Sequence, residues 1–122
     1  GAGEATVDLA DEGEPLPDEG PEAALRPVRF TDAFYESVEA AGSDGRLLLR
    51  AQEIAIRFAS LDPAAWKQAK KMQDLQNVYT LRVGIHHRLF VVRADRSELH
   101  VRELVTRESF DRALKRYRRY EF

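Results

Sequence analysis

The sequence predicts an α+β domain in which a helical hairpin packs on a small, mainly antiparallel, twisted sheet. The expected order is β-α-α-β-β-β-α, with a C-terminal helix. Between residues 31 and 61 apolar side chains recur at the spacing of an α-helix, and between residues 78 and 106 they alternate as in β-strands. After residue 109 the helical spacing returns. These changes of period give the order of the elements.

The chain divides into an acidic leader, residues 1–25, and one domain, residues 26–122. The leader holds eight of the 21 acidic residues and no Lys or Arg, so the domain keeps 13 acids against 19 bases, a balance of +6. The leader has few large apolar groups with which to offset the entropy lost on ordering, so we expect it to be disordered. A basic domain suits a phosphate-bearing partner, although a solvated, arginine-rich surface explains the charge equally well.

The domain begins with a short edge strand at residues 25–30 and a first helix. Thr31 is of the type that caps a helix N-terminus, and Phe30 and Tyr35 flank it at the spacing of a hydrophobic staple. Gly42 ends this helix, because glycine readily adopts the left-handed conformation found at helix ends.

A longer second helix follows, capped by Ser43 or Asp44, and it forms an antiparallel hairpin with the first. Asp62 and Pro63 end it and can start a short third turn through Trp66. The stripe that would face the sheet consists of Leu47, Leu48, Ala51, Ile54, Ala55 and Phe58.

Three strands follow, at residues 78–83, 88–93 and 98–106, and their short connections predict an antiparallel meander. Residues 109–120 form a final basic helix. Its inward side chains are expected to be Phe110, Ala113, Leu114 and Tyr117.

Composition excludes several kinds of site. The chain has no cysteine, and its three histidines are too few and too poorly spaced for a zinc site, so we expect neither metal nor cofactor. No apolar run approaches the ~18 residues of a membrane span, and no signal peptide is recognised. We therefore expect a cytoplasmic protein that does not engage membranes.

Three segments together resemble the RelE/ParE toxin superfamily. They are Lys-Lys-Met-Gln-Asp-Leu at residues 70–75, Val-Tyr-Thr-Leu-Arg-Val-Gly at residues 78–84, and Arg-Leu-Phe-Val-Val at residues 88–92. A further arginine, Arg107, follows the last strand, as in that superfamily. The resemblance covers residues 26 to 120, and its order of elements agrees with the one derived from periodicity.

The resemblance implies a bacterial toxin of a toxin–antitoxin pair, neutralised by a cognate antitoxin. The RelE branch implies a metal-independent endoribonuclease that cleaves mRNA on the ribosome and so inhibits translation. The alternative is a non-catalytic member that binds a protein, either gyrase, as in the ParE branch, or only its antitoxin.

The resemblance also implies site residues. Arg88 and Arg107 match positions that would stabilise the phosphate, and arginine suits this role because its planar fork binds phosphate in a bidentate manner. His87, beside Arg88, is the candidate proton carrier, although it is equally explained as a turn histidine without a task. The candidate RNA-binding residues are Arg82, Lys70, Lys71, His86 and Arg116.

One position departs from the superfamily. RelE-type ribonucleases often have a tyrosine or histidine shortly after the last arginine, where this chain has only Phe110. The acidic leader adds a separate question. It either folds back on the basic groove and competes with RNA, or acts only as a solubilising tail.

Overall fold

The computed structural model describes residues 14–15, 27–42, 45–72, 75, 77–94 and 98–119. The predicted leader therefore lies outside the described residues except for Glu14 and Pro15. Six strands and four helices are described, in the order β1 (Glu14–Pro15), β2 (Val28–Phe30), α2 (Asp32–Ala40), α3 (Arg46–Ala59), α4 (Pro63–Gln68), β3 (Ala69–Lys71), β4 (Val78–Val83), β5 (His87–Arg93), β6 (Leu99–Thr106) and α5 (Phe110–Arg119).

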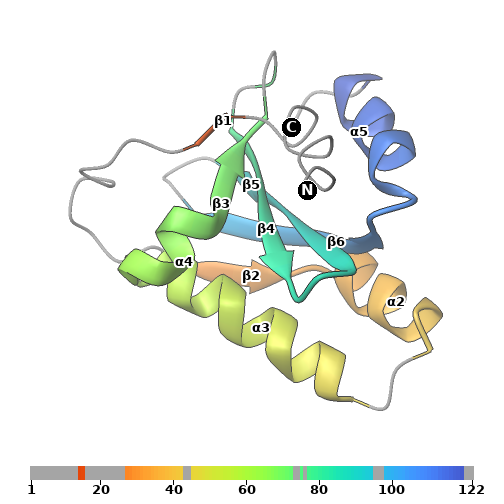
Figure 1. Cartoon of the computed structure of the whole chain (residues 1–122), viewed down its shortest axis with the longest axis horizontal. Coiled ribbons are helices and arrows are strands. Elements are labelled where there is room, and N and C mark those ends of the chain that lie inside the picture. The colour runs from red at the N-terminus through yellow and green to blue at the C-terminus, as the bar shows by residue number, and fades with distance from the viewer. Residues whose placement is uncertain are drawn as a thin grey trace, which may run out of the picture.

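The six strands form one twisted sheet in the order β1-β3-β4-β5-β6-β2 (Figure 1). All neighbouring pairs are antiparallel except β2 and β6, which are parallel. The predicted α+β class, the meander of β4, β5 and β6, the edge strand β2 and the C-terminal helix are confirmed. The sequence did not predict β1 and β3, which extend the sheet beyond β4.

The helical hairpin starts as the sequence predicts. Thr31 extends before α2, and its Oγ1 accepts a hydrogen bond from the Phe34 backbone N–H at 3.1 Å. The rings of Phe30 and Tyr35 lie 6.4 Å apart between centroids, which confirms the staple. The prediction that Ser43 or Asp44 caps α3 is wrong: the N-cap is Gly45, whose φ of 98° suits glycine and which offers no side-chain hydrogen bond.

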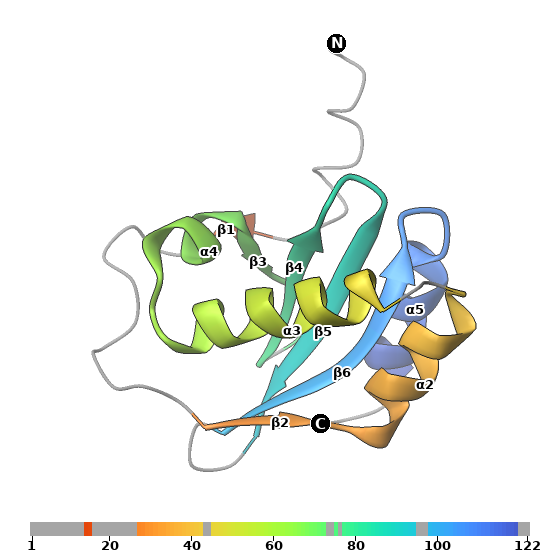
Figure 2. The ribbon, with the colours of Figure 1, turned by 90° about the horizontal axis from the view of Figure 1, so that it is seen from below.

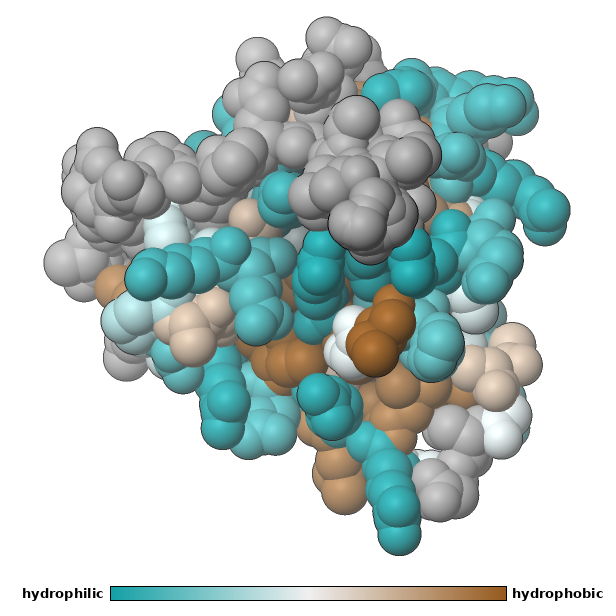
Figure 3. Space-filling model, viewed as in Figure 1, coloured by the Kyte–Doolittle hydropathy of each residue, from teal (hydrophilic) through white to brown (hydrophobic). Residues whose placement is uncertain are grey.

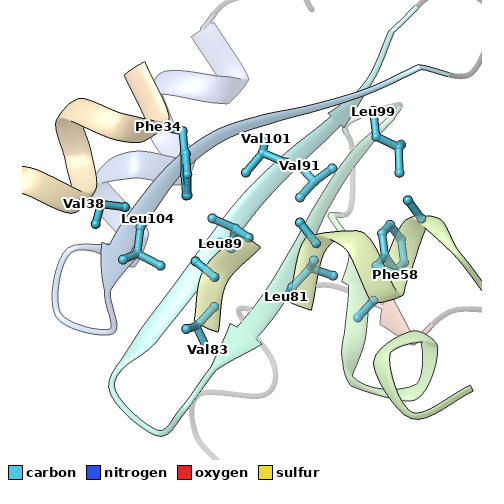
Figure 4. Packing of buried hydrophobic residues seen from close by; sticks show 14 residues of the cluster. Phe34, Val38, Phe58, Leu81, Val83, Leu89, Val91, Leu99, Val101 and Leu104 are labelled. Carbon is cyan, nitrogen blue, oxygen red and sulfur yellow. The ribbon is translucent and has the colours of Figure 1, made fainter. Parts of the chain in front are cut away.

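One face of the sheet, called here the hairpin face, is covered by α2 and α3 (Figure 2). Strand residues Leu81, Leu89 and Val101 point toward Phe34 of α2 and Phe58 of α3 and pack with them in one buried cluster (Figure 4). The predicted stripe of α3 lies on this cluster. Close packing here holds the strands of the meander in fixed register.

The opposite face, called here the α5 face, is partly covered by α5. Phe90 of β5 stacks on two rings of that helix, with centroids 5.4 Å from Phe110 and 4.4 Å from Tyr117. All four side chains predicted to point inward from the last helix are buried. The sheet therefore has a helical layer on each face, and only the smaller layer covers the α5 face.

Alternation along the strands assigns each side chain to a face. In β4, Tyr79, Leu81 and Val83 pack on the hairpin face, and Val78 packs on the α5 face. A β-bulge in β6 shifts the register between the pairs Phe90–Glu103 and Val91–Val101, which leaves Arg102 as the extra residue. Both Val101 and Leu104 therefore reach the hairpin face.

Candidate nucleic-acid interface

Arg82 and Arg88 form a cross-strand pair on the α5 face. Arg82 of β4 lies directly opposite Arg88 of β5. Two residues along the strands, Thr80 lies opposite Phe90, so alternation places both arginines on the same face as Phe90. Directly opposite residues of antiparallel strands have Cβ atoms about 4.5–5.5 Å apart, and like charges in that position destabilise the sheet.

Lys70 extends the basic row to a third strand. It lies opposite Thr80, and therefore on the α5 face, whereas Lys71 lies opposite Tyr79 and falls on the hairpin face. The structure thus separates the two lysines that the sequence grouped. Thr80 is 1% exposed, and in the described part of the chain its Oγ1 is a buried polar atom without a hydrogen-bond partner.

Arg88 also supports the turn between β4 and β5. It is 4% exposed, and its Nη1 donates hydrogen bonds to the backbone oxygens of His87, at 3.0 Å, and Ile85, at 3.4 Å. This turn contains Gly84 at a φ of 68°, a conformation that glycine adopts without strain. Arg88 therefore holds the end of the hairpin in shape in addition to contributing its charge.

Arg107 lies at the same end of the sheet. Its backbone N–H donates to the His86 oxygen at 3.0 Å, which extends the β5–β6 ladder by one step. Val105, two residues earlier, lies opposite Arg88 and packs on the α5 face, and β6 ends at Thr106, so Arg107 begins the turn that leads into α5. Arg82 and Arg88 thus share the α5 face, and the backbone of Arg107 lies beside the β4–β5 turn at the same end of the sheet.

The turn itself is open to contact. Ile85 is 72% exposed and His86 is exposed beside it. Figure 3 shows the view of Figure 1 as a mainly hydrophilic surface with a smaller brown apolar area near its middle. His86 therefore lies where a partner that approaches the arginines from the end of the sheet would touch it.

His87 lies on the other face from Arg88. It is half-buried and pairs with Val83, which packs on the hairpin face, and with Thr106. Burial, and then the neighbouring His86, lower its pKa below the usual 6.5, while the charge of Glu108 opposes them. His87 therefore favours the neutral form, which can accept a proton, but the pleat does not place it beside Arg88.

Arg116 is engaged in a structural ion pair. Both its terminal nitrogens donate to the Glu103 carboxylate at 2.9 Å, and the Tyr117 hydroxyl donates to the same carboxylate at 3.0 Å. Burial, reinforced by Glu103, raises the pKa of Tyr117 above its usual value. Sequence reasoning missed Glu103, although an acid between the apolar positions Val101 and Leu104 breaks the alternation and marks the bulge.

Two further observations concern chemistry. Phe110, at the position where a tyrosine or histidine was looked for, is 5% exposed and stacked on Phe90. Within the described residues no group of three or more His, Cys, Asp or Glu side chains gathers as a metal site would require. Nor does that part of the chain contain a helix long and apolar enough to cross a membrane.

The sequence matches no family model and no curated protein. Its structure is similar to one chain of the RelB–RelE antitoxin–toxin complex from Methanococcus jannaschii, with a TM-score of 0.53 and 19% identity. The match covers 69% of this chain and 95% of the other. The chain has the fold of the RelE-like toxins.

A second structure with the RelE-like fold agrees. One chain of the DinJ–YafQ complex of E. coli matches with a TM-score of 0.52 and 18% identity, over 69% of this chain and 96% of that one. Both matched chains are covered almost completely. The RelE-like fold predicted from three short sequence segments is therefore confirmed, and identities this low concern the fold alone.

Proposed function

We propose that this chain is the toxin of a toxin–antitoxin module and a metal-independent endoribonuclease that cleaves mRNA on the ribosome. The observation that carries the proposal is the basic row on the α5 face, where Lys70, Arg82 and Arg88 come from the neighbouring strands β3, β4 and β5, with Arg107 just after β6 and bonded to the β4–β5 turn through its backbone. The similar RelE chain was solved in an antitoxin–toxin complex, which supports a cognate antitoxin as a partner.

Each member of the row has a role in the proposed cleavage. RNA is cut without metal when its 2′-hydroxyl attacks the adjacent phosphate, which requires a proton acceptor, a proton donor and positive charge on the phosphate. Lys70 and Arg82 would position the RNA backbone. Arg88 and Arg107 would stabilise the charge that develops on the phosphate, since guanidinium groups stay protonated.

Proton transfer is assigned to the end of the sheet. An RNA strand that crosses the β4–β5 turn would meet both faces there, including half-buried His87 and exposed His86. Glu108, which sequence reasoning did not single out, lies close enough to raise the pKa of His87. We assign the proton carrier to His87, which pairs with Thr106 just before Arg107 and would take the proton of the 2′-hydroxyl and return it to the leaving 5′-oxygen, with Glu108 as the group that modulates its pKa.

A second function is favoured by one observation. Phe110 is packed into the sheet, so the position where a tyrosine or histidine was looked for offers no side chain at the surface for stacking or proton transfer. A non-catalytic member that binds gyrase, or only its antitoxin, needs no such group. This alternative predicts growth arrest with intact transcripts, or no growth arrest.

The test is to induce the chain in bacteria and map transcripts by primer extension. Discrete cuts within translated codons are expected for the wild type and should be lost in Arg82→Ala. Arg93→Ala is the matched control, because Arg93 is also a half-buried strand arginine but lies opposite Leu99, on the hairpin face. Uncut transcripts in cells that nevertheless stop growing, or cuts that persist in Arg82→Ala, would refute the proposal.

A further inference from the structure

The described part of the acidic leader lies on the sheet next to the basic row. β1 pairs antiparallel with β3, with Glu14 opposite Lys71 and Pro15 opposite Lys70, so the leader forms one edge of the sheet (Figure 1). Lys70 shares the α5 face with Thr80, and Arg82 follows two residues along β4. A backbone attachment therefore holds the leader two strands away from Arg82.

The leader contributes only negative charge at this edge. β2, the next strand along the chain, lies at the opposite edge of the sheet, and the sequence between β1 and β2 carries Asp18, Glu19 and Glu22. Residues 1–13 are attached to the sheet through β1 and contain four acids and no Lys or Arg; these acids are Glu4, Asp8, Asp11 and Glu12. This segment has the charge that complements the basic row.

The segment that precedes β1 is long enough for its acidic residues to reach Arg82. Strands lie about 4.8 Å apart and rise about 3.3 Å per residue, which places Arg82 roughly 14 Å from Glu14. An extended chain covers about 3.3 Å per residue, so the six residues back to Asp8 reach roughly 20 Å. A group on so short a tether meets its site at an effective concentration on the order of millimolar.

We infer that residues 1–13 dock on the α5 face, where the carboxylates of Asp8, Asp11 and Glu12 bind the guanidinium group of Arg82 and the ammonium group of Lys70. The surface is thus occupied by an acidic peptide of the same chain. Where this surface also binds RNA, which rests on the function proposed above, the peptide and the phosphates compete for the same cations.

Docking can be measured without RNA. The chain has no cysteine, so Ala10→Cys provides a single site for a nitroxide spin label. In the full chain the label should broaden the amide signals of Lys70, Thr80 and Arg82 and leave that of Ile56, exposed on α3, sharp. The broadening should disappear in about 0.5 M salt, at which exposed charges are screened within a few Å. Uniform broadening, or none, would overturn the inference.

Competition is tested with a labelled oligouridylate of twelve nucleotides at low salt. The triple variant Asp8→Asn, Asp11→Asn, Glu12→Gln should bind it about tenfold more tightly than the wild type, as expected for the loss of three modest ion pairs. The matched control neutralises the same number of acids on the connecting segment, Asp18→Asn, Glu19→Gln and Glu22→Gln, and should change the affinity less than about twofold.

The two proposals fail differently. Label broadening on the α5 face, with no RNA binding by any variant, would support the docking of residues 1–13 and refute the proposed ribonuclease function. RNA binding of equal strength in both triple variants, without selective broadening, would refute the docking of residues 1–13 and leave the proposed ribonuclease function unaffected.

Discussion

At the scale of single residues, Arg82 and Arg88 bring two positive charges to directly opposite positions on β4 and β5. Two cations directly opposite on antiparallel strands repel each other. Arg88 is nonetheless 4% exposed and bonded to the turn, so its charge is kept at a fixed place. Fixed charges that need no rearrangement are what a phosphate-stabilising site requires.

His87 gives a prediction at the same scale. Because burial lowers its pKa below 6.5, protonation is harder in the folded chain than in the unfolded chain. The folded state therefore loses stability as the pH falls through the unfolded pKa, and none of this loss is present above it. Thermal unfolding between about pH 7.5 and pH 5 should show a smaller decrease in Tm for His87→Gln than for the wild type.

A second variant in the same turn and a direct measurement of the pKa of His87 complete this test. His86→Gln removes the exposed neighbour whose charge helps to lower the pKa of His87, so it should reduce the pH dependence of Tm less than His87→Gln does, because burial is the larger cause. The imidazole signals in an NMR titration give the pKa of His87 directly. A value above 6.5, or an identical pH dependence of Tm in wild type and His87→Gln, would contradict the assigned burial.

Residue roles that depend on neighbours in sequence were predictable, and those that depend on the fold were not. Thr31 and Asp62 cap their helices as expected, because each bonds a backbone N–H two or three residues ahead. Gly45 replaced the expected side-chain cap, and Glu103 acquired its partners from a helix 13 and 14 residues later. No local pattern contains those contacts.

At the scale of elements, one carboxylate joins α5 to the sheet in addition to the apolar packing of that helix. Glu103 accepts two hydrogen bonds from Arg116 and one from the buried hydroxyl of Tyr117, beside the ring that stacks on Phe90. Removing the carboxylate would leave a buried hydroxyl without its acceptor, which costs about 1–3 kcal/mol. The helix that partly covers the α5 face is therefore held by Glu103 as well as by its apolar packing.

Glu103→Ala should lower the free energy of unfolding by about 1–3 kcal/mol, as measured by urea denaturation. Glu53→Ala is the matched control, since Glu53 forms an exposed ion pair with Arg57 one helical turn away. Such pairs contribute about 0.3–0.5 kcal/mol. Equal losses in the two variants would mean that the Glu103 contacts do not hold α5.

Long, periodic elements were predictable and short ones were not. β4 spans the same residues as the predicted strand, and α5 differs by one residue at each end. β3 has only three residues and follows directly on α4, so Ala69 read as the continuation of a helical pattern. β1 has two residues, and its pairing with β3 is a long-range contact that its own composition does not predict.

At the scale of the molecule, the two faces of the sheet differ in the helices that cover them and in their charge. The hairpin face is closed by α2 and α3 and contributes the larger core, while the α5 face carries the basic row beyond the smaller helix. Sequence periodicity indicated that Arg82 and Thr80 share one side of β4, and the motif resemblance drew attention to Arg88 and Arg107. Only the strand register shows that Lys71 and His87 fall on the other face. It also determines which helix covers which face.

The central claim is that basic groups from separate strands gather on the α5 face to bind one RNA backbone. Chemical-shift mapping of the full chain with a short oligouridylate tests it most directly. The account predicts salt-sensitive shifts at Lys70, Thr80, Arg82 and Arg88, with Arg57 and Arg93 unmoved. Shifts confined to α3 and the hairpin face, with the basic row unaffected, would contradict it.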